Sequence, residues 1–94
     1  MSMIFEWDET KAVANIEKHG ISFDEAQTIF SDPDSLTIYD DAHSENEERF
    51  IDIGRSTAGR ILVVVYTERD DRIRIITSRF ATARERAQYA QHDT

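Results

Sequence analysis

The sequence predicts a small α+β domain in which helices pack on an antiparallel sheet. Three observations lead to this class. The chain has 94 residues, the length of one domain. Its apolar residues recur at helical spacing near both ends, and between them, over residues 36–78, the apolar period changes to two. We therefore expect residues 1–94 to form a single domain with two N-terminal helices and one C-terminal helix.

The first elements are a short strand and a helix. Residues 4–7 (IFEW) have the apolar character of a strand, and the aspartate that follows is a suitable N-cap for a helix over residues 9–19. Ala12, Val13 and Ile16 lie at helical spacing. This spacing predicts that they form the buried stripe of the helix.

The second helix has a clear start and a clear end. Ser22 and Glu25 match the S-x-x-E capping box, in which each side chain satisfies a backbone N–H of the other residue. Phe23 and Ile29 give this helix an apolar face. Pro33 ends the segment, because proline cannot continue the helical hydrogen-bond ladder.

Four successive strands follow. Their predicted ranges are 36–39, 48–54, 60–67 and 72–78. The connecting segments STAG and RDD are short enough for antiparallel hairpins. The run ILVVV is apolar on both faces, which predicts a central strand covered from both sides.

The last of these strands carries arginine on one face. Arg72 and Arg74 alternate with Ile73 and Ile75, so the two pairs point to opposite faces. Continuing this alternation places Arg79 with the isoleucines, unless a bulge or the end of the strand redirects it.

The final element is a helix. Thr82 and Glu85 form a second capping box, T-x-x-E, for a helix over residues 83–91. Glu85 and Tyr89 are four residues apart, so they share a face of this helix.

Composition restricts the class and location of the protein. The chain has no cysteine, which excludes disulfides and thiolate metal sites and fits a reducing compartment. It has no apolar run approaching the roughly 18 residues that span a bilayer, and its N-terminus lacks the basic start of a signal peptide. We therefore expect a soluble, cytoplasmic protein without a membrane partner.

Charge is distributed unevenly along the chain. The formal net charge is −8. Residues 1–54 carry 14 acidic and 3 basic side chains, whereas residues 55–86 carry 8 arginines and 4 acidic side chains. Such asymmetry indicates a charged ligand or partner, and a solubilising surface with chance clustering is the alternative. Arginine binds phosphate through two parallel hydrogen bonds, which favours a phosphate-bearing ligand.

Much of the basic charge lies on the last hairpin and the final helix. The six arginines there are Arg69, Arg72, Arg74, Arg79, Arg84 and Arg86. They form either a phosphate-binding surface, helped by the N-terminus of the helix, or a set of surface salt bridges with nearby carboxylates. The spacing of the residues favours neither interpretation over the other.

Two further clusters have structural explanations. Lys18 and His19 end the first helix, where the helix dipole favours a cation and histidine is a common cap. The segment over residues 40–49 is rich in carboxylates, which suit hard cations, but it lacks the glycine of an EF-hand loop. The three histidines do not have zinc-ligand spacing either. We interpret the segment as a solvated loop and expect no metal site.

Three stretches of the chain resemble the BrnT family of bacterial type II toxins. They are FEWDETKAVANIEKHGISFDEA, EERFIDIG and GRILVVVYTERDDRIRIITSRFATARERAQY, and they extend from about Phe5 to Tyr89. The resemblance implies a RelE-like ribonuclease fold, cleavage of RNA and growth arrest, without a metal or an organic cofactor. It also implies a 2:2 complex with a BrnA-type antitoxin, whose DNA-binding domain brings the complex to operator DNA.

The resemblance places function in the motifs KHG, ERF, SR and ARE. Our hypothesis for the roles within these motifs is that Lys18, His19 and Glu85 serve proton transfer or charge support, and that Arg49 and Arg79 hold the scissile phosphate. The candidates for contacts to flanking RNA are Arg69, Arg72, Arg74 and Tyr89. In metal-free cleavage the ribose 2′-OH attacks the adjacent phosphate, so RNA is cut and DNA is not.

Two other functions stay open. The chain can be a non-catalytic corepressor of the same fold that acts only through the antitoxin. It can also be an unrelated α+β interaction module whose arginines pair with its own carboxylates. In the toxin interpretation, the acidic N-terminal half is suited to contact a basic stretch of the antitoxin.

Overall fold

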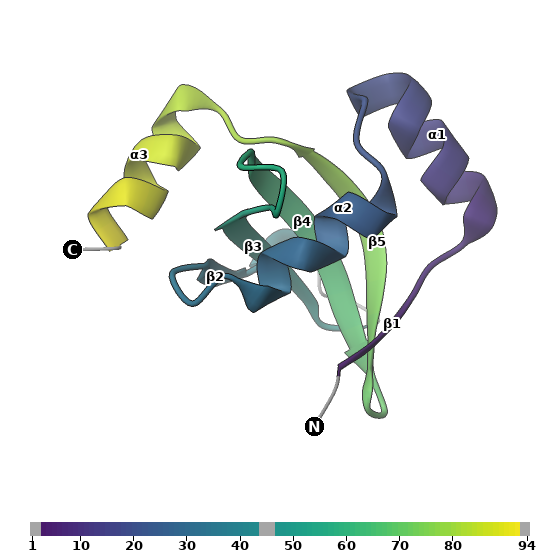
Figure 1. Cartoon of the computed structure of the whole chain (residues 1–94). Helices are drawn as coiled ribbons and strands as arrows, with labels where there is room; N and C mark the ends of the chain where they lie inside the picture. Colours follow the sequence, from purple (N-terminus) through teal and green to yellow (C-terminus); the bar gives the residue numbers. More distant parts are fainter. Residues whose placement is uncertain (1–2, 44–46, 93–94) are drawn as a thin grey trace.

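The computed structural model describes residues 3–43 and 47–92. Its elements in chain order are β1 (Ile4–Glu6), α1 (Glu9–His19), α2 (Phe23–Gln27), the 3-10 helix η1 (Thr28–Ser31), β2 (Leu36–Tyr39), the 3-10 helix η2 (Asp41–His43), β3 (Arg49–Arg55), β4 (Ile61–Arg69), β5 (Arg72–Phe80) and α3 (Ala83–His92). Helices cover a five-stranded sheet (Figure 1), which confirms the α+β class. Residues 44–46 of the predicted acidic loop lie outside the described residues.

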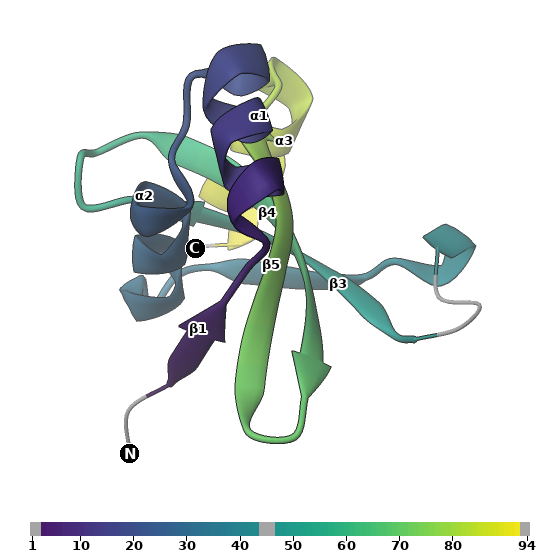
Figure 2. The same ribbon diagram turned by 90° about the vertical axis from the view of Figure 1, so that its right-hand side faces the viewer.

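The sheet is mixed, so the prediction of a purely antiparallel sheet is wrong. The strand order is β1-β5-β4-β3-β2, and all neighbours are antiparallel except β1 and β5. Figure 2 shows β1 running beside β5 before the chain enters α1. A parallel pair needs a long crossover. Here the crossover comprises every element from α1 to β4, and the short segment IFE has no local signal that identifies its partner.

Helix α1 packs on the sheet through a different face than predicted. Its buried residues are Ala12 and Asn15. Val13 and Ile16, which were expected in the core, are 53% and 50% exposed. The prediction is confirmed for Ala12 and is wrong for Val13 and Ile16, because a polar side chain determines which face of this helix lies against β5.

Asn15 is the residue that attaches α1 to the sheet. Its amide donates hydrogen bonds of 2.9 Å to the carbonyls of Ile21 and Ser78. Its amide oxygen accepts hydrogen bonds of 3.1 Å from the backbone N–H of Ser78 and from the hydroxyl of Thr77. Asn15 thereby satisfies backbone groups of β5 beyond the three residues that pair with β1.

Both predicted capping boxes lie at helix starts. The Ser22 hydroxyl accepts a 3.0 Å hydrogen bond from the backbone N–H of Glu25, and the Glu25 carboxylate binds Arg60 instead of reaching back to the cap. At α3 the box is reciprocal, because the Thr82 hydroxyl accepts from the Glu85 N–H and the Glu85 carboxylate accepts from the Thr82 N–H.

Buried side chains form two apolar clusters, one on each face of the sheet. The cluster beneath α1 and α2 contains Ala12, Ile21, Phe23, Ala26, Ile29, Leu62, Val64, Tyr66 and Ile75. The other contains Ile53, Val63, Ala81 and Tyr89 and lies beneath α3. Strand β4 contributes alternate residues to both clusters, so the prediction that it is central and covered from both sides is confirmed.

A β-bulge reverses the orientation of side chains along β5. The register of β4 and β5 shifts between Val65 and Tyr66, where Ile76 is the extra residue on β5. Beyond the bulge, Arg79 faces the same side of the sheet as Arg72. The bulge allowed for in the sequence analysis is therefore present.

A buried carboxylate in β3 gives a first testable prediction. Asp52 is 3% exposed and accepts a 2.9 Å hydrogen bond from the Tyr66 hydroxyl. Burial raises the pKa of Asp52 above its ordinary value of 3.8. The folded protein therefore binds this proton more tightly than the unfolded chain, and stability is lost as the pH rises through the folded pKa.

We expect Asp52→Asn to raise the free energy of unfolding at pH 7 and to change it little near pH 3.5. The neutral amide oxygen still accepts from Tyr66, and no buried charge remains. Urea unfolding at the two pH values measures the difference, with the exposed Asp24→Asn as the matched control. An effect of equal size at both pH values would contradict this account.

Candidate functional site

Six arginines of β3, β4 and β5 lie on one face of the sheet. Arg55 lies at the end of β3, and the other five are here called the arginine face. They are Arg49, Arg69, Arg72, Arg74 and Arg79. Cross-strand partners share a face, and residues two apart on a strand return to it. Arg49 and Arg74 both pair with Thr67, and Arg69 pairs with Arg72. The fold thus brings arginines of three strands to the same surface.

The arginine face has two separate groups. One group lies near the β4–β5 turn and is here called the hairpin group; its members are Arg49, Arg69, Arg72 and Arg74. Arg79 lies at the opposite end of β5, where it pairs with Val63. Val63 and Thr67 are four residues apart on β4, which corresponds to about 13 Å. The two arginines predicted to hold the scissile phosphate therefore belong to different groups.

Carboxylates partly neutralise the hairpin group. Arg69 forms a 2.9 Å ion pair with Glu47. Arg72 and Arg74 share Glu6, at 3.4 and 3.3 Å. Two guanidinium groups around one carboxylate leave one positive charge in excess. Glu6 was missed in the sequence because only the parallel pairing of β1 with β5 brings it to these arginines.

Arg79 and Glu85 form the best-defined charged pair. Arg79 Nη1 and Nη2 donate to the two carboxylate oxygens of Glu85 at 2.7 and 2.8 Å, and Nη1 also donates to the Phe80 carbonyl at 3.3 Å. The Arg79 guanidinium lowers the pKa of Glu85 to about 2. Glu85 is therefore ionised at neutral pH but is a weak base, and it fixes Arg79 at the start of α3.

Lys18 and His19 lie at the end of α1, against the middle of β5. With Ile76 and Thr77 they border a shallow hollow of about 170 Å³. Lys18 is exposed and His19 is half-buried. Thr77 precedes Arg79 by two residues, so the fold brings the end of α1 close to the segment of β5 that carries Arg79.

Tyr89 has a structural position and is not open to a ligand. It is 6% exposed, and its hydroxyl donates a 2.7 Å hydrogen bond to Asp32. Burial and this carboxylate raise the pKa of Tyr89 to about 12. The prediction that Tyr89 contacts RNA does not fit this placement, because the ring and the hydroxyl serve the packing of α3.

Within residues 3–43 and 47–92, no three histidine, aspartate or glutamate side chains gather as metal ligands. Over the same ranges, no helix has the length and apolar character needed to cross a bilayer.

Comparisons with known proteins identify the family. A family model described as the ribonuclease toxin BrnT of type II toxin–antitoxin systems matches residues 7–85. The fold is similar to the crystal structure of the Brucella abortus ribonuclease toxin BrnT, with a TM-score of 0.66 and 24% identity. That similarity covers 86% of this chain and 99% of the Brucella chain. A search of curated proteins gives no match.

The two matches support different conclusions. At 24% identity the structural similarity establishes the fold, whereas the family match spans most of the sequence. A type II toxin family implies an antitoxin partner. The chain belongs to the BrnT family of ribonuclease toxins of type II toxin–antitoxin systems.

Proposed function

We propose that this protein is a cytoplasmic, metal-independent endoribonuclease that arrests growth until a BrnA-type antitoxin binds it. The 2:2 complex with the DNA-binding antitoxin then acts on operator DNA. The observation that carries the nuclease proposal is Arg79, held in place by Glu85 and close to the end of α1 with Lys18 and His19. The RelE-like relationship of the fold belongs to the same proposal, supported by N-terminal helices packed on a strand meander.

We assign Arg79 to binding of the scissile phosphate. An arginine has five N–H donors, and Glu85 with the Phe80 carbonyl engages three of them. The remaining N–H groups are available to a phosphate oxygen. A cation already held in place stabilises the charge that develops on phosphorus without reorganisation during the reaction. Glu85 is then a positioning residue for Arg79.

Lys18 and His19 are assigned to proton transfer. One group removes the proton of the 2′-OH and another protonates the leaving oxygen, each contributing about 10²–10⁴-fold. Histidine exchanges protons near neutral pH, and Lys18 is exposed beside His19 at the end of α1. Substrate that enters along β5 reaches this pair and Arg79 together.

The hairpin group of the arginine face is assigned to flanking RNA. Arg72 and Arg74 carry the excess positive charge left by their shared partner Glu6. Arg49 and Arg69 extend this surface across β3 and β4. The chain has a net charge of −8, which repels RNA at long range, so these contacts act only after close approach.

Expression of the chain alone, and together with its antitoxin, tests the proposal. We expect growth arrest and RNA fragmentation only without antitoxin. The purified protein should cleave RNA in the presence of EDTA, and a substrate with a 2′-deoxy nucleotide at the cleaved position should resist. Cleavage that requires a divalent cation would contradict the mechanism.

The corepressor alternative has one observation in its favour. Arg69, Arg72, Arg74 and Arg79 each have a carboxylate partner, as in a surface stabilised by ion pairs. A wild-type chain that binds antitoxin and supports repression, yet leaves RNA intact and growth unaffected, would establish this alternative.

A further inference from the structure

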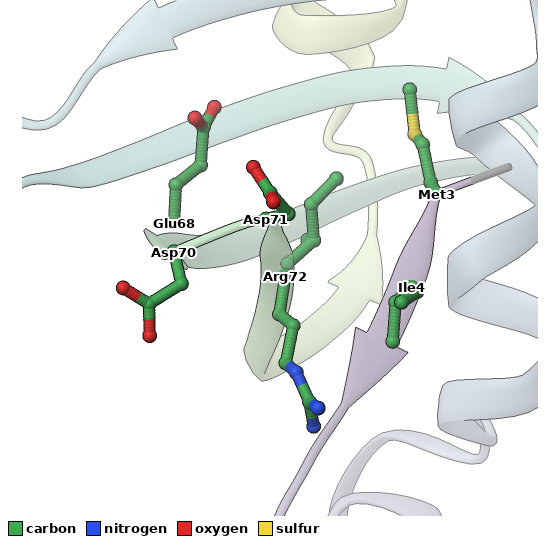
Figure 3. Close-up of a pocket in the computed structure, with 7 residues that line it drawn as sticks. Met3, Ile4, Glu68, Asp70, Asp71 and Arg72 are labelled. Carbon is green, nitrogen blue, oxygen red and sulfur yellow. The ribbon is translucent and has the colours of Figure 1, made fainter. Parts of the chain in front are cut away.

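An acidic groove with one apolar side lies beside the β4–β5 turn, far from the start of α3. It has a volume of about 530 Å³ and is lined by Met3, Ile4, Glu68, Asp70, Asp71, Arg72 and Ile73. Figure 3 shows Ile4 of β1 and the preceding Met3 at one side of the groove, and the carboxylates of Glu68, Asp70 and Asp71 at the other. Met3 and Ile4 are 55% and 50% exposed, so apolar surface is open here.

The same groove borders an open edge of the sheet. β1 is an outer strand, and among the described elements only β5 pairs with it. Proteins usually protect such edges with lysine, proline or a covering segment. The three residues of β1, Ile4–Glu6, include neither lysine nor proline. Its outer backbone groups are therefore suited to an added strand.

The carboxylates of the groove are not compensated within the described part of the chain. Glu68, Asp70 and Asp71 take part in none of the ion pairs found among residues 3–43 and 47–92. Arg72, the cation of the lining, is bound to Glu6. A segment that enters the groove therefore meets three uncompensated negative charges opposite an apolar side.

From these observations we propose that the groove binds an extended segment of the antitoxin, which adds to β1 as a strand. Its apolar side chains cover Met3 and Ile4, and its lysine or arginine residues face the acidic rim. The inference rests on the proposed function only in naming the antitoxin as the partner. A second copy of this chain is disfavoured as the occupant, because it would bring an identical acidic rim against the first.

This docking also explains how an antitoxin can act on RNA binding. Arg72 lines the groove and belongs to the hairpin group of the arginine face, two residues from Arg74. A strand on β1 lies beside both residues, and its basic side chains compete with them for nearby phosphate. The bound segment therefore covers one end of the surface assigned to flanking RNA.

Antitoxin binding to two pairs of matched variants tests the proposal by calorimetry. Ile4→Asp should raise the dissociation constant at least tenfold, whereas Val13→Asp, on the exposed side of α1, should not change it. Glu68→Lys with Asp71→Lys should slow association at low salt. The control for this double variant is Glu9→Lys with Glu17→Lys on α1, which makes the same change in net charge. Asp70 is left intact, because its φ of 55° disfavours lysine.

Hydrogen exchange and sedimentation complete the test. Antitoxin should slow exchange of amides in residues 4–6, as a new strand partner requires, and thermal unfolding should show that each variant is folded. Unchanged affinity of the groove variants, or sedimentation of the free toxin as a dimer that Ile4→Asp dissociates, overturns the proposal. Nuclease activity of the free chain is measured separately, so loss of the groove proposal leaves the nuclease assignment standing.

Discussion

Replacing Arg79 with alanine is expected to abolish growth arrest and to lower the rate of RNA cleavage by about 10²–10³-fold. This is the usual cost of removing one fixed donor to a transition-state charge. The fold should persist, because the Arg79–Glu85 pair is partly exposed and contributes about 1 kcal/mol or less. Single-turnover cleavage and thermal unfolding measure the two effects. Arg84→Ala, which removes an exposed arginine of α3, is the matched control.

Glu85→Gln separates positioning from proton transfer. Glutamine keeps the capping box of α3 but no longer fixes Arg79 through two charged hydrogen bonds. We expect the variant to lose about tenfold in kcat or less. The cleavage rate of the wild type should not follow the titration of this carboxylate above pH 4, because the pKa of Glu85 is about 2. A loss as large as that of Arg79→Ala, with a new pH dependence, would instead identify Glu85 as a base.

Arg49 should behave differently from Arg79. It lies in the hairpin group, on the far side of Thr67 from Arg74. Contacts to a flanking phosphate support binding of substrate and transition state alike, so their removal raises KM more than it lowers kcat. We expect this pattern for Arg49→Ala. A fall in kcat equal to that of Arg79→Ala would show that both arginines hold the same phosphate.

Local signals in the sequence predicted local structure well. The capping residues Ser22 and Thr82 are at helix starts in the structure. The apolar run ILVVV identified β4 and alternation identified β5, since the side chains that form each pattern are adjacent in the chain. The same alternation placed Arg72 and Arg74 on one face, because strand periodicity determines which residues share a face.

Long-range features were not predictable by the same reasoning. The pairing of Glu6 with Arg72 and Arg74 depends on a parallel contact between the first and last strands. The burial of Tyr89 depends on Asp32, which is 57 residues away. Neither partner affects the local pattern, so the sequence is equally consistent with an exposed and a buried role for these residues.

The second large effect is expected at Asn15. Asn15→Ala should lower the free energy of unfolding by about 3 kcal/mol, because it leaves three buried backbone groups without their partner. For a domain of this size the melting temperature should fall by on the order of 15 °C. Urea unfolding measures the change. Val13→Ala, on the exposed side of the same helix, should cost well below 1 kcal/mol.

Thr77→Val and Asn15→Asp locate the origin of this loss. Thr77→Val removes only the side-chain hydrogen bond to Asn15, so we expect a cost of about 1 kcal/mol. Asn15→Asp places a carboxylate oxygen against the carbonyls of Ile21 and Ser78 and buries a charge, so it should cost at least as much as alanine. A tolerated aspartate would show that the two donated hydrogen bonds contribute little.

Asn15 also connects stability to the proposed chemistry. It fixes α1 on β5 one turn before Lys18 and His19, the residues assigned to proton transfer. At a temperature where Asn15→Ala is folded, its cleavage rate should therefore remain below that of the wild type, whereas Val13→Ala should retain full activity. Full activity of the folded Asn15→Ala variant would mean that the end of α1 does not need this anchor, and would weaken the assignment of Lys18 and His19.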